Sequence, residues 1–247
     1  MATDPILEPD YARLAESSPA PPRKYAHLQF RPATRLHGSF TAAAEKRLLI
    51  WMAERLPAWV NSDHLTALGA AGMLLAGVSL GISRWHASAL LAANVFLLVN
   101  WFGDSLDGTL ARVRNCQRPR FGFYVDHVVA VLGAAALLGG YAVSGAMHPL
   151  LAAALLIGFL MVMAEVVMAT YCLGQFHMSF WRLGPTELRI LLMLGNVALL
   201  WRPTVGVLGH RVPLFDFGGA IGAAGLLLTF MLAAARHTAQ LYREETE

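Results

Sequence analysis

Three aspartates, Asp104, Asp107 and Asp126, lie within or beside two long apolar runs of the sequence. Acidic side chains at membrane depth are costly, and they usually mark an ion or substrate site. Carboxylates with open coordination positions suit Mg²⁺ or Mn²⁺, which prefer oxygen ligands and bring phosphates with them. The stretch 103–130 therefore predicts a divalent-metal site that handles a phosphorylated substrate.

The spacing of these acids fits two helices. On the first helix, four residues share one face, at positions i, i+3, i+4 and i+7: Asp104, Asp107, Gly108 and Ala111. Glycine in a helix costs roughly 1 kcal/mol relative to alanine, but it lets a ligand approach the backbone closely. Gly122 and Asp126 repeat this arrangement at i and i+4 on the next helix. We therefore expect carboxylates above small residues on both helices.

These residues resemble the signature of the class I CDP-alcohol phosphotransferases, which are integral membrane enzymes of phospholipid synthesis. The match comprises Asp104-x-x-Asp107-Gly108-x-x-Ala111-Arg112 and, after nine intervening residues, Gly122-x-x-x-Asp126. We call these seven residues the signature. The resemblance implies that its three aspartates hold Mg²⁺ or Mn²⁺. It also implies that the nucleotide contacts five members of the signature: Asp107, Gly108, Ala111, Arg112 and Gly122.

The family pattern continues with a fourth aspartate, and this sequence has Ala130 at that position. The resemblance implies that the fourth acid helps to hold metal and acts as a base. A methyl group does neither, so we expect the chain to bind metal and CDP-alcohol but to turn over slowly. The alternative is a catalytically inactive relative, natural or engineered, that binds both without transfer.

Two further places resemble the choline and ethanolamine phosphotransferases. The segment 184–187, Gly-Pro-Thr-Glu, matches that subgroup, and His127 follows Asp126 as in its Asp-His pair, where the histidine is a proposed base. The resemblance therefore implies catalytic roles for His127 and Glu187. The alternative is ordinary helix-opening chemistry of the Pro-x-Glu type. Against the subgroup, Phe123 stands where its members have an acid.

Other polar residues have weaker functional readings. The segment 61–66 resembles the family's Pro-Asn-x-Leu-Thr segment, which places Asp63 and Thr66 beside the nucleotide. The alternative is a helix N-cap at Ser62 or Asp63. Glu165, inside a later apolar run, fits a neutral hydrogen-bonded interior acid as well as it fits a role in the site.

The composition places the chain among membrane proteins, since 56% of its 247 residues are hydrophobic and 14% are charged. Six apolar runs, each near the length that spans about 30 Å of hydrocarbon, predict transmembrane helices: 64–82, 87–110, 125–146, 149–173, 187–201 and 217–237. The fifth run is the weakest, because it is short and contains Arg189. The fold class predicted is an all-α integral membrane protein with six transmembrane helices.

The distribution of basic residues predicts the orientation of these helices. With the N-terminus in the cytosol, all but three of the 19 lysines and arginines fall on the cytosolic side. The exceptions are Arg84, Arg202 and Arg211. We expect cytosolic termini, a signature at the cytosolic face, and free thiols at Cys116 and Cys172. A predicted loop between the second and third helices carries four arginines that suit topology control and anionic head groups: Arg112, Arg114, Arg118 and Arg120.

The chain divides into three parts. Residues 1–37 are polar and proline-dotted without an apolar h-region, which predicts a flexible cytosolic tail. Residues 38–60 predict an amphipathic helix in the membrane interface, and a soluble helix that packs on a partner is the alternative. Residues 61–247 form the transmembrane domain. The apolar side expected for the amphipathic helix consists of Phe40, Ala44, Leu48, Trp51 and Met52.

These observations predict transfer of a substituted phosphate from a CDP-alcohol to a lipid or small alcohol, with release of CMP. An ion-coupled transporter is the distant alternative, but the chain is small and its acids gather at one membrane face. We expect membrane lipids around the chain and no nucleic-acid partner. The sequence leaves open a homodimer, the identity of both alcohols, and the catalytic base.

Overall fold

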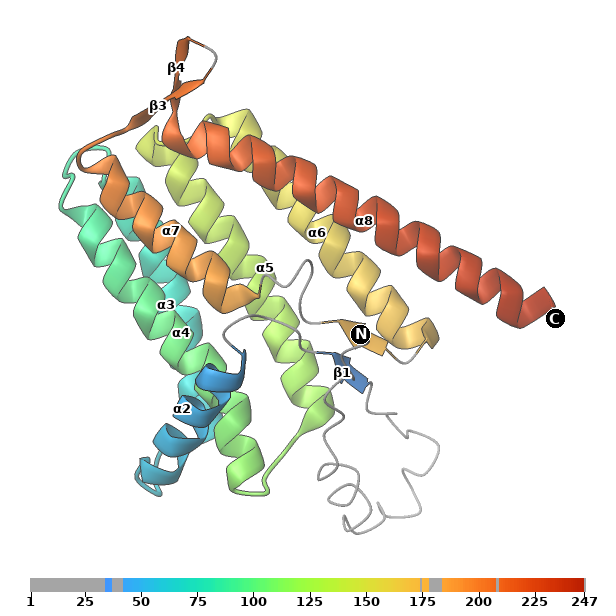
Figure 1. The fold of residues 1–247 in the computed structure, drawn as a ribbon. Coiled ribbons are helices and arrows are strands. Elements are labelled where there is room, and N and C mark those ends of the chain that lie inside the picture. The colour runs from blue at the N-terminus through green and yellow to red at the C-terminus, as the bar shows by residue number, and fades with distance from the viewer. Residues whose placement is uncertain (1–33, 37–41, 174, 178–183, 208, 247) are drawn as a thin grey trace, which may run out of the picture. The chain divides into compact units, whose positions relative to one another are not determined.

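Helices make up most of the computed structural model, which describes residues 34–36, 42–173, 175–177, 184–207 and 209–246. All of these residues belong to one unit, Pro32–Glu247. Figure 1 shows the helices in chain order: α2 (Ala42–Arg55), α3 (Ser62–Ile82), α4 (Ala89–Val113), α5 (Pro119–Ser144), α6 (Pro149–Leu173), α7 (Pro185–Leu199) and α8 (Leu214–Thr246).

The structure confirms an all-α membrane protein, and five of its helices are long and apolar enough to cross a membrane: α3, α4, α5, α6 and α8. The predicted fifth span is the shorter helix α7, whose 15 residues reach only roughly 22 Å at 1.5 Å per residue. Helix α5 begins at Pro119 and not at residue 125, because proline is favoured in a first turn. Helix α8 continues past the predicted end at 237.

Glycines set the close packing of α3 against its neighbours. A Cβ added at Gly69 would lie 2.9 Å from the backbone nitrogen of Asp104, and one at Gly72 would lie 2.8 Å from that of Asn100. A Cβ at Gly77 would collide with the carbonyl of Ala136 on α5. Small residues allow such backbone approach between membrane helices. Helix α3 therefore holds the signature helices α4 and α5 on its two sides.

Helix α2 packs beside α4 at the end of the bundle that carries the signature (Figure 1). Its Leu49 and Ala53 join Leu65, Leu106 and Leu110 in a buried cluster. The membrane-interface position predicted for this helix stays a prediction. Met52 packs against that cluster, but Leu48 and Trp51 are exposed, and Phe40 and the side chain of Ala44 lie outside the described residues.

A buried polar network fixes α7 against the spans. The hydroxyl of Tyr141 on α5 donates to Asn196 Oδ1 at 2.8 Å. Asn196 Nδ2 donates in turn to Asn94 Oδ1 on α4 at 2.8 Å, and Asn94 Nδ2 donates to the carbonyl of Met193 at 3.0 Å. Because buried polar groups are costly unless paired, this network specifies where α7 docks.

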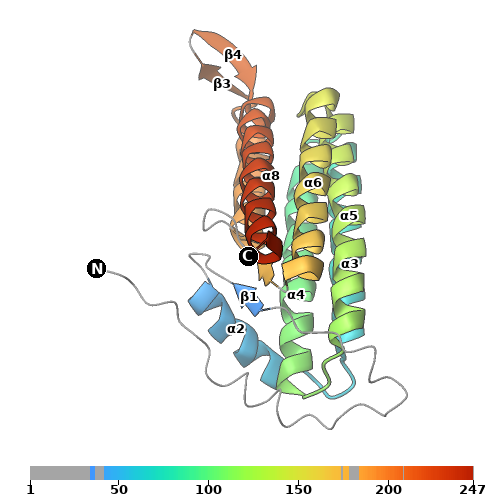
Figure 2. The same cartoon turned by 90° about the vertical axis from the view of Figure 1, so that its right-hand side faces the viewer.

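Helix α8 packs mainly on α6, beside which it runs in both views (Figures 1 and 2). Two small sheets complete the described residues. Strand β1 (Thr34–Leu36) pairs in parallel with β2 (Gln175–His177), and β3 (Thr204–Val207) forms an antiparallel hairpin with β4 (His210–Pro213). The remainder of the predicted tail, 1–33 and residue 37, lies outside the described residues.

Candidate functional site

The signature lies on two consecutive helices, α4 and α5, which both pack on α3. Helix α4 carries the first five signature residues, and α5 carries Gly122 and Asp126. Asp104 and Asp126 each lie near enough to Asp107 for their charges to act on it. We call Asp104, Asp107 and Asp126 the aspartate cluster.

Residues in the first turns of α3 hold Asp107 in place, and Asp107 is only 8% exposed. Its Oδ2 accepts a hydrogen bond from Thr66 Oγ1 at 2.6 Å, and its Oδ1 accepts one from the backbone N–H of Gly108. Ser62 Oγ donates to the main-chain carbonyl of Asp107 at 2.9 Å. Thr66, predicted to lie beside the nucleotide, therefore orients a signature acid.

Asp104 is paired with an arginine that the sequence reading did not assign to the site. Arg189 on α7 places Nη2 2.5 Å from Asp104 Oδ2, and its Nε donates to Asn100 Oδ1 at 2.8 Å. The Asp104 side chain is 46% exposed, so one side of it faces open space. The available signal was a basic residue within an apolar run, which usually has a polar partner.

The two signature glycines differ from the glycines that pack α3. Among the residues that the structure describes, a Cβ added at Gly122 would meet no atom within 4 Å, and one at Gly108 would meet only Arg112 Nη1, at 3.4 Å. Neither glycine is needed for helix packing. Since both cost helix stability without gaining a protein contact, their position is typical of a surface that a ligand approaches.

The arginines of the predicted basic loop have separate structural roles. The connection between α4 and α5 is shorter than predicted, so Arg112 lies in the last turn of α4, where its Nη2 donates to Thr109 Oγ1 at 3.0 Å. Arg114 donates to the carbonyls of Leu56 and Pro57, both at 3.0 Å, and fixes the entry to α3. Arg118 and Asp63 form an ion pair.

His127 and Glu187 each bond to the backbone of their own segment. His127 Nδ1 lies 2.7 Å from the carbonyl oxygen of Phe123, four residues earlier on α5. Glu187 Oε2 accepts the N–H of Gly184 at 2.9 Å, which is the capping arrangement given above as the alternative to catalysis. Ala130 is half-buried on α5, one helical turn beyond Asp126.

Glu45 of α2 is a second residue that the sequence reading missed. Its Oε1 accepts hydrogen bonds from Trp101 Nε1 at 2.9 Å and Thr186 Oγ1 at 2.7 Å, and Ser105 Oγ lies 3.4 Å away. One carboxylate thus joins α2, α4 and α7. No local sequence pattern predicts these hydrogen bonds, because the partners of Glu45 are 56 to 141 residues away in the chain.

The donor chemistry of the aspartate cluster fits a hard divalent cation. Carboxylate oxygens are the ligands that Mg²⁺ and Mn²⁺ prefer, and repulsion among three neighbouring acids favours a cation between them. Within the residues that the structure describes, no three His, Cys, Asp or Glu side chains are grouped closely enough to hold a metal ion. Convergence of the cluster on one ion therefore stays a prediction.

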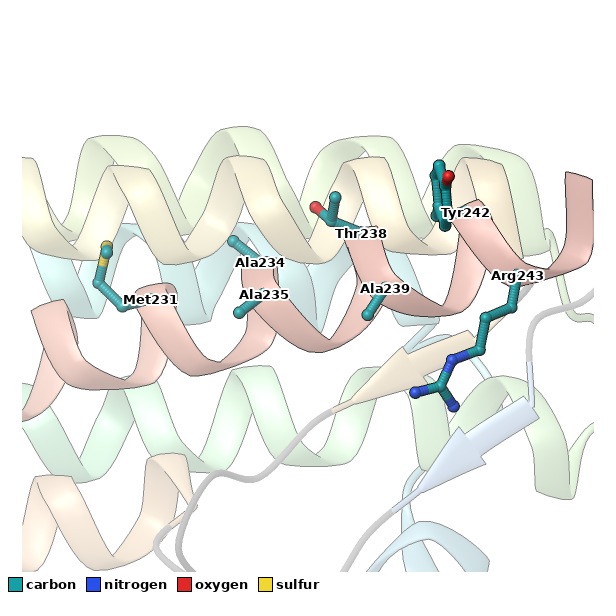
Figure 3. A pocket seen from close by; sticks show the side chains of 7 residues that line it. All are labelled: Met231, Ala234, Ala235, Thr238, Ala239, Tyr242 and Arg243. Atoms are coloured by element: carbon teal, nitrogen blue, oxygen red, sulfur yellow. The ribbon is translucent and has the colours of Figure 1, made fainter. Parts of the chain in front are cut away.

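Two further features lie on helices outside the signature. Glu165 of α6 is buried, and its Oε1 lies 2.5 Å from His237 Nδ1 on α8. A shallow groove of about 530 Å³ follows α8 along small and apolar side chains between Met231 and Arg243 (Figure 3). None of the side chains that line it belongs to the signature. Small side chains on such a face are typical of surfaces that meet lipid or another helix.

Comparison with known proteins identifies one family. Residues 59–233 match the model of the CDP-alcohol phosphatidyltransferases, and this range includes the whole signature. Curated proteins give no match to the chain. The family's members transfer groups from CDP-alcohols to alcohol acceptors in membranes and generally depend on a divalent metal ion.

Proposed function

Because the chain belongs to the CDP-alcohol phosphatidyltransferase family, we propose that it transfers a substituted phosphate from a CDP-alcohol to an acceptor alcohol and releases CMP. The observation that carries this proposal is the ligand-accessible backbone at Gly108 and Gly122, beside three neighbouring aspartates. A diphosphate needs both features, since its charge requires a cation and its bulk requires space close to the helices.

The residues of the site divide the work of binding. Asp104, Asp107 and Asp126 would hold Mg²⁺ or Mn²⁺, which supplies charge neutralisation as CMP leaves. Arg112 lies beside Gly108 and can donate two parallel hydrogen bonds to a phosphate. Thr66 keeps the Asp107 carboxylate in one orientation. Catalysis in phosphoryl transfer is mostly positioning and electrostatics, which these fixed side chains provide.

The acceptor hydroxyl attacks the β-phosphorus, the bond from that phosphorus to the CMP oxygen breaks, and the hydroxyl proton passes to a base. The Phe123 carbonyl oxygen can only accept a hydrogen bond, so its contact with His127 Nδ1 places the proton of a neutral ring on that nitrogen. The lone pair then lies on Nε2, and His127 therefore suits the role of base. Ala130 removes the acid that the family pattern places here, so turnover is slow.

The site lies at the cytosolic border of the membrane in this proposal. The N-in orientation puts the ends of α4 and α5 that carry the signature on the side with most of the basic residues. There a lipid substrate reaches the site from the bilayer, and the leaving nucleotide departs into water. The exposed Leu48 and Trp51 of α2 suit a helix that lies in the interface.

A thermal-shift assay in detergent micelles tests binding. CDP-choline, CDP-ethanolamine or CDP-diacylglycerol with Mg²⁺ should raise the melting temperature, because a ligand at 100 times its Kd stabilises by about 2.7 kcal/mol. The same nucleotides should give little shift with Asp107→Asn. If none of them shifts the unsubstituted chain, the proposal is wrong. A shift with sodium ions alone would favour the ion-coupled transporter.

The second candidate is an inactive relative, which Ala130 favours. Such a protein gives the same thermal shift and releases no CMP. Measurement of CMP release therefore separates the two candidates, and substitution of Ala130 shows whether the missing acid is the reason.

A further inference from the structure

Arg189 is a charged side chain that is largely buried among the described residues. It is the fifth residue of α7, and its side chain is only 11% exposed. A basic side chain among apolar helices persists when it has partners that compensate its charge. The described partners of Arg189 are Asn100 and Asp104, both on α4.

The guanidinium is held in place by a buried amide. Arg189 Nε donates to Asn100 Oδ1 at 2.8 Å, and Asn100 Nδ2 donates to the carbonyl of Gly69 at 2.9 Å. Asn100 is 3% exposed and has little freedom to move. This contact fixes the plane of the guanidinium, so that Nη2 reaches Asp104 Oδ2 at 2.5 Å.

The positive charge of Arg189 affects how strongly the aspartate cluster attracts a metal ion. The aspartate cluster carries a charge of −3 when ionised, and Arg189 reduces it to −2. A guanidinium on one oxygen of Asp104 also leaves that oxygen less able to bind a metal ion. Both effects weaken the attraction of the cluster for a divalent cation.

We infer that Arg189 competes with the divalent metal ion for Asp104 and sets the metal affinity of the aspartate cluster. This inference rests on the proposed function, because it requires the cluster to bind metal. It assigns Arg189 the role of a positioning and affinity-determining residue. A purely structural role predicts weaker metal binding on its removal, whereas competition predicts tighter binding.

The test is a titration of purified protein in detergent micelles with Mn²⁺, followed by calorimetry, in the absence of nucleotide. Arg189→Gln and Arg189→Met remove the charge and should each bind Mn²⁺ at least about tenfold more tightly, which is 1.4 kcal/mol. Arg189→Lys keeps the charge and should stay within about threefold of the unsubstituted chain.

Arg120→Gln is the matched control, because it removes the same charge from an exposed position on α5. Its Mn²⁺ affinity should change less than about twofold, since solvent and salt screen exposed charges. Size-exclusion profiles and metal-free melting temperatures establish that each variant is folded, and the methionine variant serves if the glutamine variant is not.

Equal or weaker Mn²⁺ binding by both charge-removing variants would overturn the inference, as would an equal gain in Arg120→Gln. If the unsubstituted chain binds no Mn²⁺ with or without CDP-alcohol, the metal-dependent proposal itself fails. If the unsubstituted chain binds Mn²⁺ and only the expected change is missing, the proposed function stands and the role of Arg189 is wrong.

Discussion

Gly122→Ala should have opposite effects on the stability of the protein and on its affinity for CDP-alcohol. The added methyl group meets no atom of the described residues within 4 Å. Alanine is also better than glycine within a helix by roughly 0.8–1.0 kcal/mol. We therefore expect the substitution to stabilise the protein, with a melting temperature higher by about 2–4 °C for a chain of this size.

The same methyl group should weaken ligand binding. If the nucleotide lies against α5 at Gly122, the methyl occupies space that the ligand needs, and the ligand must shift or lose contacts. We expect the affinity for CDP-alcohol to fall at least about tenfold, which corresponds to 1.4 kcal/mol. Stability and binding should thus change in opposite directions.

Thermal unfolding in the same detergent, with and without CDP-alcohol and Mg²⁺, measures both effects. Gly103→Ala is the matched control, because its Cβ would lie 2.5 Å from the carbonyl of Leu65 on α3. That variant should be destabilised by about 1–3 kcal/mol. The reasoning is refuted if Gly122→Ala binds CDP-alcohol as tightly as the unsubstituted chain, or if it loses stability like the control.

Three further substitutions test individual contacts. Arg112→Ala should weaken CDP-alcohol binding in calorimetry by at least about tenfold, whereas Arg120→Ala should change it by less than about twofold; equal losses would mean that the basic residues act only as a diffuse field. Thr66→Val removes the hydroxyl that orients Asp107 and should lower the Mn²⁺ affinity about 10–100-fold, as loss of a metal ligand's hydrogen-bond partner commonly does. Thr66→Ser keeps the hydroxyl and should keep the Mn²⁺ affinity, and an unchanged Mn²⁺ affinity in the valine variant would show that this hydrogen bond is not needed. Arg114→Ala should cost about 1–3 kcal/mol in thermal unfolding, because four carbonyls between α2 and α3 each lose a hydrogen bond. A stability equal to that of Arg120→Ala would contradict this role.

Much of the fold follows from local patterns. The run 149–173 matches α6 residue for residue, because Pro149 opens the helix and a stretch that is apolar apart from Glu165 and a few small polar residues continues to Leu173. The i, i+3, i+4 and i+7 spacing around Asp104 is realised on α4. The apolar run that predicts α5 begins only at residue 125, because the first turn of this helix, Pro-Arg-Phe-Gly, interrupts the apolar pattern.

The contacts that the sequence could not predict are long-range. Arg189 and Asp104 are 85 residues apart, and Arg118 and Asp63 are 55 apart, so no local spacing relates either pair. The parallel pairing of β1 with β2 joins segments of three residues, too short for any period to be visible. Residue types identified the acids of the site, but tertiary packing chose the side chains that support them.

CMP release is the measurement that tests the central claim most directly. Purified protein in mixed micelles would receive CDP-choline, CDP-ethanolamine or CDP-diacylglycerol with Mg²⁺ and a panel of acceptor alcohols. We predict slow, acceptor-dependent release of CMP by the chain as it stands, at least about tenfold faster release by Ala130→Asp, and none when Asp107→Asn is added to that variant. No CMP release by Ala130→Asp with any pair of substrates, from protein that binds CDP-alcohol, would contradict the assignment as a transferase.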